Sequence, residues 1–302
     1  MNLDILNWWA TSGLPTIEQF FGRLPFEWAQ QTFMVRALIE CLLLAPICAV
    51  MGVKVVNFRM AFFSDAISHS AFAGVAIGLL LNEFFSLPGD DPFYPRLSLI
   101  GFGLLVGLGI ALVRRRTSLS NDTVIGVFFS AVVALGIAIV TSSGSRTADF
   151  QRYLYGDILT LDAADLGLTA LLAGVVLVFA GLGFNSMLML GLNAELAHSR
   201  GIRVRLYDYL FAVVLALVVT VSIRTAGILL VTALLVVPAA AARNVAANAG
   251  GMLRWAIVFG LASAISGTLA SYSPYLHNMS TGAAIVLTAA LLFALSFVAR
   301  RA

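Results

Sequence analysis

The sequence predicts an all-α protein that crosses a membrane about nine times, and three observations support this prediction. Of the 302 residues, 60% are hydrophobic and only 11% are charged, whereas soluble domains carry about 25% charged residues. Apolar runs of about 20 residues, long enough to cross a bilayer, recur along nearly the whole chain. Short polar segments with turn residues separate the runs, and none is long enough to bury a soluble core.

The first 31 residues precede the membrane-spanning part. Pro15 and Pro25 interrupt this stretch, and a proline inside a helix removes a backbone hydrogen-bond donor. Its tryptophan and phenylalanine residues suit the interface between lipid and water. We therefore expect residues 1–31 to form an interfacial arm and residues 32–302 to form a single transmembrane domain.

Nine apolar runs follow the arm, and each predicts one membrane-spanning helix. The sixth and seventh runs are separated only by SIRTAG at 222–227, so the alternative is eight spans, with these two runs forming one bent or re-entrant element. Pro46 and Pro238 fall inside runs and predict helix kinks. The predicted spans are residues 33–56, 63–82, 96–113, 122–141, 166–188, 208–224, 227–243, 252–271 and 281–299.

The distribution of basic residues predicts the orientation of the chain. Segments 54–59, 114–116, 200–205, 243–254 and 300–301 hold twelve of the eighteen Lys and Arg residues. These segments all fall on one side of the membrane if the spans alternate in direction. Because cytoplasmic loops carry an excess of Lys and Arg, we expect the N-terminus outside and the C-terminus in the cytoplasm.

Two ionisable residues interrupt the second span, in the stretch RMAFFSDAISHSAFAG at 59–74. Asp65 and His69 are four residues apart and share one helix face, with Ser68 beside them. A charged residue inside a membrane costs about 3 kcal/mol or more, so such residues usually face a bundle interior or a wet cavity. The spacing alone leaves three interpretations open: a structural Asp–His hydrogen bond, a site for a divalent metal ion, and a proton relay.

Arg36 and Glu40 form a second pair four residues apart, in the outer half of the first span. Opposite charges at this spacing face each other on a helix. We expect the two side chains to neutralise each other inside the membrane, and a gate or a second ion site is the alternative.

The polar segment GLNAELAHSRGIRVRLYDYL at 191–210 lies on the predicted cytoplasmic side. It predicts a short helix that ends near Gly201, since glycine favours the turn after a helix. The pattern Glu195-x-Ala197-x-x-x-Gly201 resembles the cytoplasmic coupling segment of ABC importers, which docks on an ATPase subunit, and we assign this segment to residues 190–207. The alternative is an amphipathic loop helix lying on lipid headgroups.

The sequence also lacks the motif of an ATP-driven motor. A P-loop needs a lysine in the pattern G-x-x-x-x-G-K-[ST], and the only lysine is Lys54, in GVKVV. A separate subunit must therefore hydrolyse ATP if ATP drives this protein. No serine nucleophile elbow or H-E-x-x-H motif is present, so we expect no enzymatic activity.

Four segments together resemble the metal-type ABC permease family, the membrane subunits of zinc, manganese and iron importers. The resemblance covers most of residues 30–300, in the expected order. The matching segments are GVKVVNFRMAFFSDAISHSAFAGVAIGLLL at 52–81, NDTVIGVFFS at 121–130, YLYGDILTLDAADL at 153–166 and AGILLVTALLVVPAAAAR at 226–243.

The resemblance implies a location, partners and roles for particular residues. A member of this family lies in the cytoplasmic membrane of a prokaryote as a homodimer, with two ATPase subunits and an extracytoplasmic metal-loaded binding protein. Asp65, His69 and Ser68 would line the path of a zinc, manganese or ferrous ion. Glu195, Ala197 and Gly201 would belong to the coupling segment. No permanently bound cofactor and no nucleic acid is expected.

Two other kinds of transporter are the alternatives. One is an ABC permease for a metal chelate, which needs a wider path. The other is a proton-coupled secondary transporter, which predicts uptake without an ATPase and an inverted repeat. We find no such repeat in the sequence. Imidazole and carboxylate ligands suit zinc, manganese and iron alike, so the sequence does not distinguish these metals.

Overall fold

The computed structural model describes residues 13–23, 25–84, 93–142, 158, 161–192, 194–272 and 279–301. This part of the chain is helical and contains no strand. Nine of its helices are long and apolar enough to cross a membrane. The predicted all-α membrane fold is confirmed.

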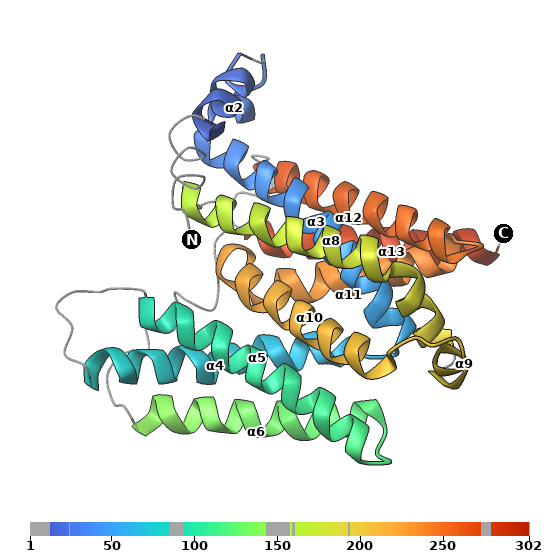
Figure 1. The fold of residues 1–302 in the computed structure, drawn as a ribbon. Coiled ribbons are helices and arrows are strands. Elements are labelled where there is room, and N and C mark those ends of the chain that lie inside the picture. Colours follow the sequence, from blue (N-terminus) through green and yellow to red (C-terminus); the bar gives the residue numbers. More distant parts are fainter. Residues whose placement is uncertain are drawn as a thin grey trace. The chain divides into compact units, whose positions relative to one another are not determined.

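The described chain divides into two compact units, and the first unit combines the start, the middle and the end of the sequence. It spans Met1–Val53, Asp157–Ala180 and Thr225–Ala302. Within it α11, α12 and α13 pack against one another (Figure 1). Its helices are α2 (Leu14–Phe21), η2 (Glu27–Gln30), most of α3 (Thr32–Asn57), the first part of α8 (Ala163–Leu192), α11 (Ile228–Val245), α12 (Ala249–Ser271) and α13 (Thr281–Arg301).

The second unit spans Lys54–Gly156 and Gly181–Arg224. Its helix α4 packs against both α5 and α6, and the three lie side by side (Figure 1). The second unit therefore holds both the Asp65–His69 stretch and the predicted coupling segment. Its helices are α4 (Ala61–Phe84), α5 (Phe93–Arg116), α6 (Asn121–Ser142), the last part of α8, α9 (Ala194–Ser199) and α10 (Val204–Ala226) up to Arg224.

The sixth and seventh predicted spans are two separate helices. Helix α10 ends at Ala226 and α11 begins at Ile228. Gly227 between them has φ 79° and ψ 161°, a conformation that is essentially restricted to glycine. The described residues therefore hold nine candidate spans, the predicted number.

Small residues let helix backbones approach one another closely in the second unit. A Cβ atom on Gly74 of α4 would lie 3.0 Å from the Cα of Leu99 in α5. A Cβ atom on Gly107 of α5 would lie 3.2 Å from the Cβ of Ala216 in α10. These contacts hold α4 and α10 against α5. The outer surfaces of the helices remain apolar, with exposed side chains such as Leu105 and Val127.

Both prolines that predict kinks lie inside helices. Pro46 lies in α3 and Pro238 in α11, and each helix continues on both sides of its proline. The predicted kinks stay predictions. Pro238 is buried, so its ring packs against neighbouring side chains.

Arg36 and Glu40 do not pair with each other, contrary to the sequence prediction. Arg36 Nε donates to Glu18 Oε1 at 2.7 Å, and its Nη1 donates to the Leu161 carbonyl at 3.2 Å. Glu40 is fully buried, and its Oε1 accepts a hydrogen bond from Thr169 Oγ1 at 3.0 Å. The predicted ion pair is therefore wrong. The physical reason is tertiary: α2 supplies an acid for Arg36, and α8 supplies a hydroxyl for Glu40.

Candidate functional site

A tight turn positions the helix that carries Asp65 and His69. After α3 the chain turns through Phe58 and Arg59, and Arg59 adopts a φ of 54°, a region that residues other than glycine rarely occupy. Met60 and Phe63 then anchor the start of α4, since both are almost completely buried. The start of α4 is therefore fixed by buried side chains that precede the ionisable pair.

Asp65 and His69 lie together on one face of α4, as the spacing predicts. The ring nitrogen Nδ1 of His69 lies 2.9 Å from the backbone carbonyl oxygen of Asp65 and 3.6 Å from its carboxylate Oδ1. A carbonyl oxygen only accepts hydrogen bonds, so Nδ1 carries the proton and donates. In a neutral imidazole the other nitrogen, Nε2, then holds the lone pair.

The pair is partly open at the surface of the chain. The side chain of His69 is 29% exposed and that of Asp65 is 37% exposed. Two rings hold the imidazole in place: Phe72 is stacked with it at 5.8 Å between centroids, and Phe129 of α6 meets it edge-on at 4.9 Å. A free Nε2 and a carboxylate one helical turn apart are two ligands suited to a first-row divalent ion.

Ser68 differs from the other two predicted path residues because it is buried. It has no exposed surface, and its hydroxyl has no hydrogen-bond partner among the described residues. Buried hydroxyl groups nearly always have a partner. Its predicted contact with the ion stays a prediction.

The described part of one chain brings together too few ligands to retain a metal ion. No group of three or more His, Cys, Asp or Glu side chains suited to a metal ion occurs in the described part of the chain. Structural zinc sites use four ligands. The Asp65–His69 pair can therefore contact an ion but cannot enclose it without further ligands.

The predicted coupling segment contains a short helix, α9 (Ala194–Ser199), which follows α8 (Figure 1). Ala197 is fully buried, and its carbonyl accepts a hydrogen bond from the Ile202 amide at 3.1 Å. Gly201 has φ 76°, so the predicted glycine turn after the helix is confirmed. The backbone of Glu195 belongs to α9, and its side chain lies outside the described part.

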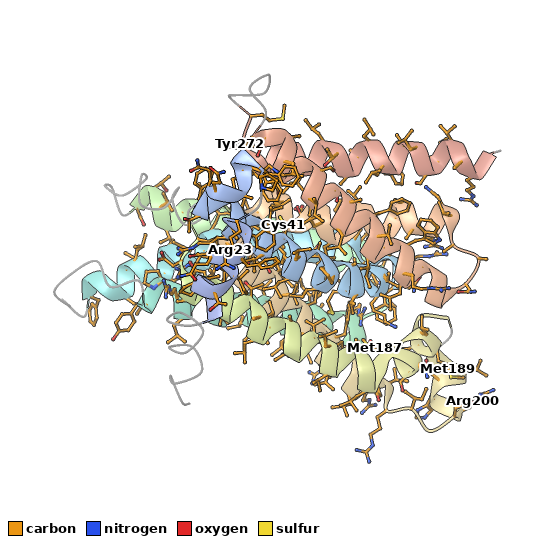
Figure 2. All side chains as sticks on the ribbon, turned by 90° about the horizontal axis from the view of Figure 1, so that it is seen from above. Arg23, Cys41, Met187, Met189, Arg200 and Tyr272 are labelled. Atoms are coloured by element: carbon orange, nitrogen blue, oxygen red, sulfur yellow. The ribbon has the colours of Figure 1, made fainter. Side chains whose placement is uncertain are left out.

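Some of the residues next to α9 are buried and others are exposed. Figure 2 shows Met187 and Met189 on the last turns of α8, near Arg200, which follows α9. Met187 is 1% exposed, whereas Arg200 is exposed. This region of the second unit thus combines a buried methionine with an exposed basic residue.

Sequence reasoning missed a charged cluster close to this segment. The carboxylate of Asp208, in the first turns of α10, forms an ion pair with Arg114 Nη2 at 3.1 Å and accepts a hydrogen bond from Arg115 Nη1 at 2.9 Å. In the sequence, Arg114 and Arg115 indicate only the orientation of the chain. Asp208 lies at the boundary of a predicted span. The signal available in the sequence was Asp208 itself, a single acidic residue that follows Arg203 and Arg205.

Comparison with known proteins relates the chain to one transport family. Residues 30–300 match the model of the family described as "ABC 3 transport family". The match covers in full the segments 52–81, 121–130 and 226–243, which carry the sequence resemblance. It also covers the fourth segment, 153–166, most of whose first half lies outside the described residues.

Several curated proteins and solved structures are similar over nearly their whole length. A "Manganese transport system membrane protein MntC" from Listeria monocytogenes is 32% identical, with 89% of this chain and 91% of that protein covered. A "High-affinity zinc uptake system membrane protein ZnuB" from Haemophilus influenzae is 30% identical, with 87% and 96% covered. The structure "PsaBC from Streptococcus pneumoniae in complex with Fab" matches with a TM-score of 0.72, 29% identity, and 93% and 94% covered.

Proposed function

The chain belongs to the ABC 3 transport family, and from that premise we propose that it is the membrane-spanning permease of an ATP-driven importer of divalent transition-metal ions. It is a multi-pass membrane protein with nine candidate spans in its described part. Similar proteins are manganese and zinc transport membrane proteins by name. We further propose that it lies in the cytoplasmic membrane of a prokaryote, with its N-terminus outside and its C-terminus inside.

The observation that carries the proposal is the geometry of Asp65 and His69. The hydrogen bond from Nδ1 to the Asp65 carbonyl leaves Nε2 without a partner among the described residues, beside a carboxylate on the same helix face. Both groups are partly exposed in an otherwise apolar chain. An ionisable pair inside a membrane protein is a marker of a substrate or ion pathway.

Two ligands per chain support a homodimer as the working form. Two copies related by a two-fold axis would bring two imidazoles and two carboxylates to one point, which equals the four ligands of a tetrahedral site. A conduit must also release its ion, so shared coordination by two chains suits passage better than a closed site within one chain. We propose no permanently bound cofactor, because the metal ion is the cargo.

We assign ATP hydrolysis to a separate ATPase subunit, present in two copies, and delivery of the metal to an extracytoplasmic binding protein. The sequence supports this division because its only lysine lies outside any P-loop pattern. Helix α9, with Glu195 and Ala197, and the turn at Gly201 would receive the motion of the ATPase. The path would then open alternately to the two sides of the membrane.

The direct test is metal uptake by the complete complex in liposomes, with ATP inside and the loaded binding protein outside. Radiolabelled Mn²⁺, Zn²⁺ and Fe²⁺ are supplied separately. We expect Asp65→Ala and His69→Ala each to reduce uptake by about tenfold or more, the order of loss found when a metal-site partner is removed. The matched control is Asp122→Ala, an exposed acid in the first turn of α6.

Three outcomes would contradict parts of this proposal. Normal uptake by both variants would show that the pair is structural. Uptake by the unmodified complex without ATP would favour a secondary transporter. If the unmodified complex carries none of the three ions, the divalent-metal assignment itself is wrong.

A further inference from the structure

The two ends of the transport process, the coupling segment and the Asp65–His69 pair, belong to the same compact unit. The same unit holds a cluster made of Phe58, the Asp208 carboxylate and the two arginines of α5. We call it the Asp208 clamp, and we define it by Phe58, Arg114, Arg115 and Asp208. The proposal made here rests on the proposed function and adds a specific linkage to it.

The first half of the linkage is the short, hydrogen-bonded connection between α9 and α10. Arg200, Gly201 and Ile202 donate backbone hydrogen bonds to Leu196, His198 and Ala197. Helix α10 begins at Val204, only a few residues after α9 ends. Because this connection is short and hydrogen-bonded, a displacement of α9 moves the first turns of α10, where Asp208 lies.

The second half runs from Asp208 to the start of α4. Arg114 Nη2 forms an ion pair with Asp208 at 3.1 Å, and its Nη1 donates to the Met60 sulfur at 2.7 Å. Met60 directly precedes α4, and its own side chain is 1% exposed. Asp65 and His69 follow within the first turns of the same helix. The arginine therefore joins the first turns of α10 to the base of the helix that carries the ion ligands.

Phe58 adds a second contact between the same elements. Its ring meets Phe211 of α10 edge-on at 5.2 Å. It also packs on the end of α8, because a Cβ atom on Gly191 would lie 3.1 Å from the Phe58 ring. Its carbonyl oxygen accepts from Asn121 Nδ2 of α6 at 3.3 Å. One residue of the α3–α4 turn thus contacts three other helices at this end of the unit.

The charges of the Asp208 clamp favour a role in transmitting movement between helices over a purely stabilising role. Three charged side chains meet with exposures of 15%, 15% and 23%. Apolar residues of similar size often stabilise a protein as well as such a cluster does, and ionic clusters are best documented as devices that set register or switch. The neighbouring residue Arg59 also has a left-handed backbone, with φ 54°, and such conformations persist only where the surrounding structure imposes them.

We propose that the Asp208 clamp is a positioning device that couples the movement of α9 to α4, and hence the ATPase cycle to the Asp65–His69 pair. Asp208, Arg114 and Arg115 touch neither the ion nor the ATP. They hold α10 and α4 in one register, so that both move together.

The test measures ATP hydrolysis and Mn²⁺ uptake in the same liposomes, which contain the complete complex. In Asp208→Asn we expect hydrolysis to stay within about twofold of the unmodified rate while uptake falls about 5- to 20-fold, which lies in the lower part of the range of ordinary coupling between two sites. Asp208→Glu keeps the charge and should keep most of the uptake. Asp122→Asn, the same change at an exposed site in α6, should alter neither rate.

The charge-exchanged double variant Asp208→Arg with Arg115→Asp separates pairing from folding. It should regain uptake relative to the single variant Asp208→Arg. If Asp208→Asn forms too little complex, Arg115→Gln replaces it, because Arg114 still holds the carboxylate there. Equal loss of hydrolysis and uptake, or no loss of either, would overturn the linkage. Failure of the unmodified complex to import Mn²⁺, Zn²⁺ or Fe²⁺ would instead overturn the proposed function.

Discussion

At the scale of single residues, hydrogen-bond partners decide what an ionisable side chain can do. His69 and Glu40 both lie in predicted spans at four-residue spacing from another ionisable residue. His69 bonds within its own helix, which leaves Nε2 free for a ligand. Glu40 instead bonds to Thr169 of α8 and is fully buried. The same spacing therefore yields an open site in one helix and a contact between helices in the other.

The buried contact of Glu40 predicts a stability effect. Glu40→Ala removes the acceptor for the Thr169 hydroxyl and leaves it unpaired, so we expect a loss of about 1–3 kcal/mol in the free energy of unfolding. Thermal unfolding of the purified protein in detergent measures this. The matched control is Glu18→Ala, whose ion pair with Arg36 is partly exposed at 19% and 30% and should contribute less, about 1 kcal/mol. Equal effects of the two variants would contradict the assigned role of burial.

At the scale of elements, the break between α10 and α11 depends on one residue. Leucine, valine and isoleucine dominate both sides of the break, so composition alone does not separate two helices from one. Gly227 separates them because its φ of 79° and ψ of 161° end one helix and let the next begin. A residue with a Cβ atom adopts this conformation only with strain.

The break predicts that glycine is required at this position. We expect Gly227→Ala to lower the free energy of unfolding by about 1–3 kcal/mol. Gly174→Ala in α8 is the control, because a Cβ atom there meets nothing within 4 Å and alanine favours a helix. The unfolding temperatures of the two variants are compared in the same detergent. A Gly227→Ala variant as stable as Gly174→Ala would refute the requirement for this backbone conformation.

At the scale of the whole molecule, the charge distribution predicts which ends of the helices face the cytoplasm. Labelling of introduced cysteines can test this orientation, because the two native cysteines are buried. Cys41 is 1% exposed and Cys48 has no exposed surface. Figure 2 shows Cys41 among packed side chains. A membrane-impermeant thiol reagent should therefore leave the unmodified chain unlabelled.

Single cysteines at exposed positions then report the orientation. With the C-terminus inside, Ser280→Cys before α13 should react in intact cells, whereas Ser199→Cys in α9 should react only after the cells are opened. Both serines are exposed and both changes are nearly isosteric. The reverse pattern would invert the orientation proposed from the positive-inside rule.

The sequence by itself determined the class of the protein and the placement of Asp65 and His69 on one helix face. These features depend on local properties: apolar length, charge density and spacing along one helix. Only the tertiary structure decided which partners Arg36 and Glu40 take, that Ser68 is buried, and that Asp208 binds Arg114 and Arg115. Those contacts join residues far apart in the chain, and no local pattern specifies which side chain a distant helix will supply.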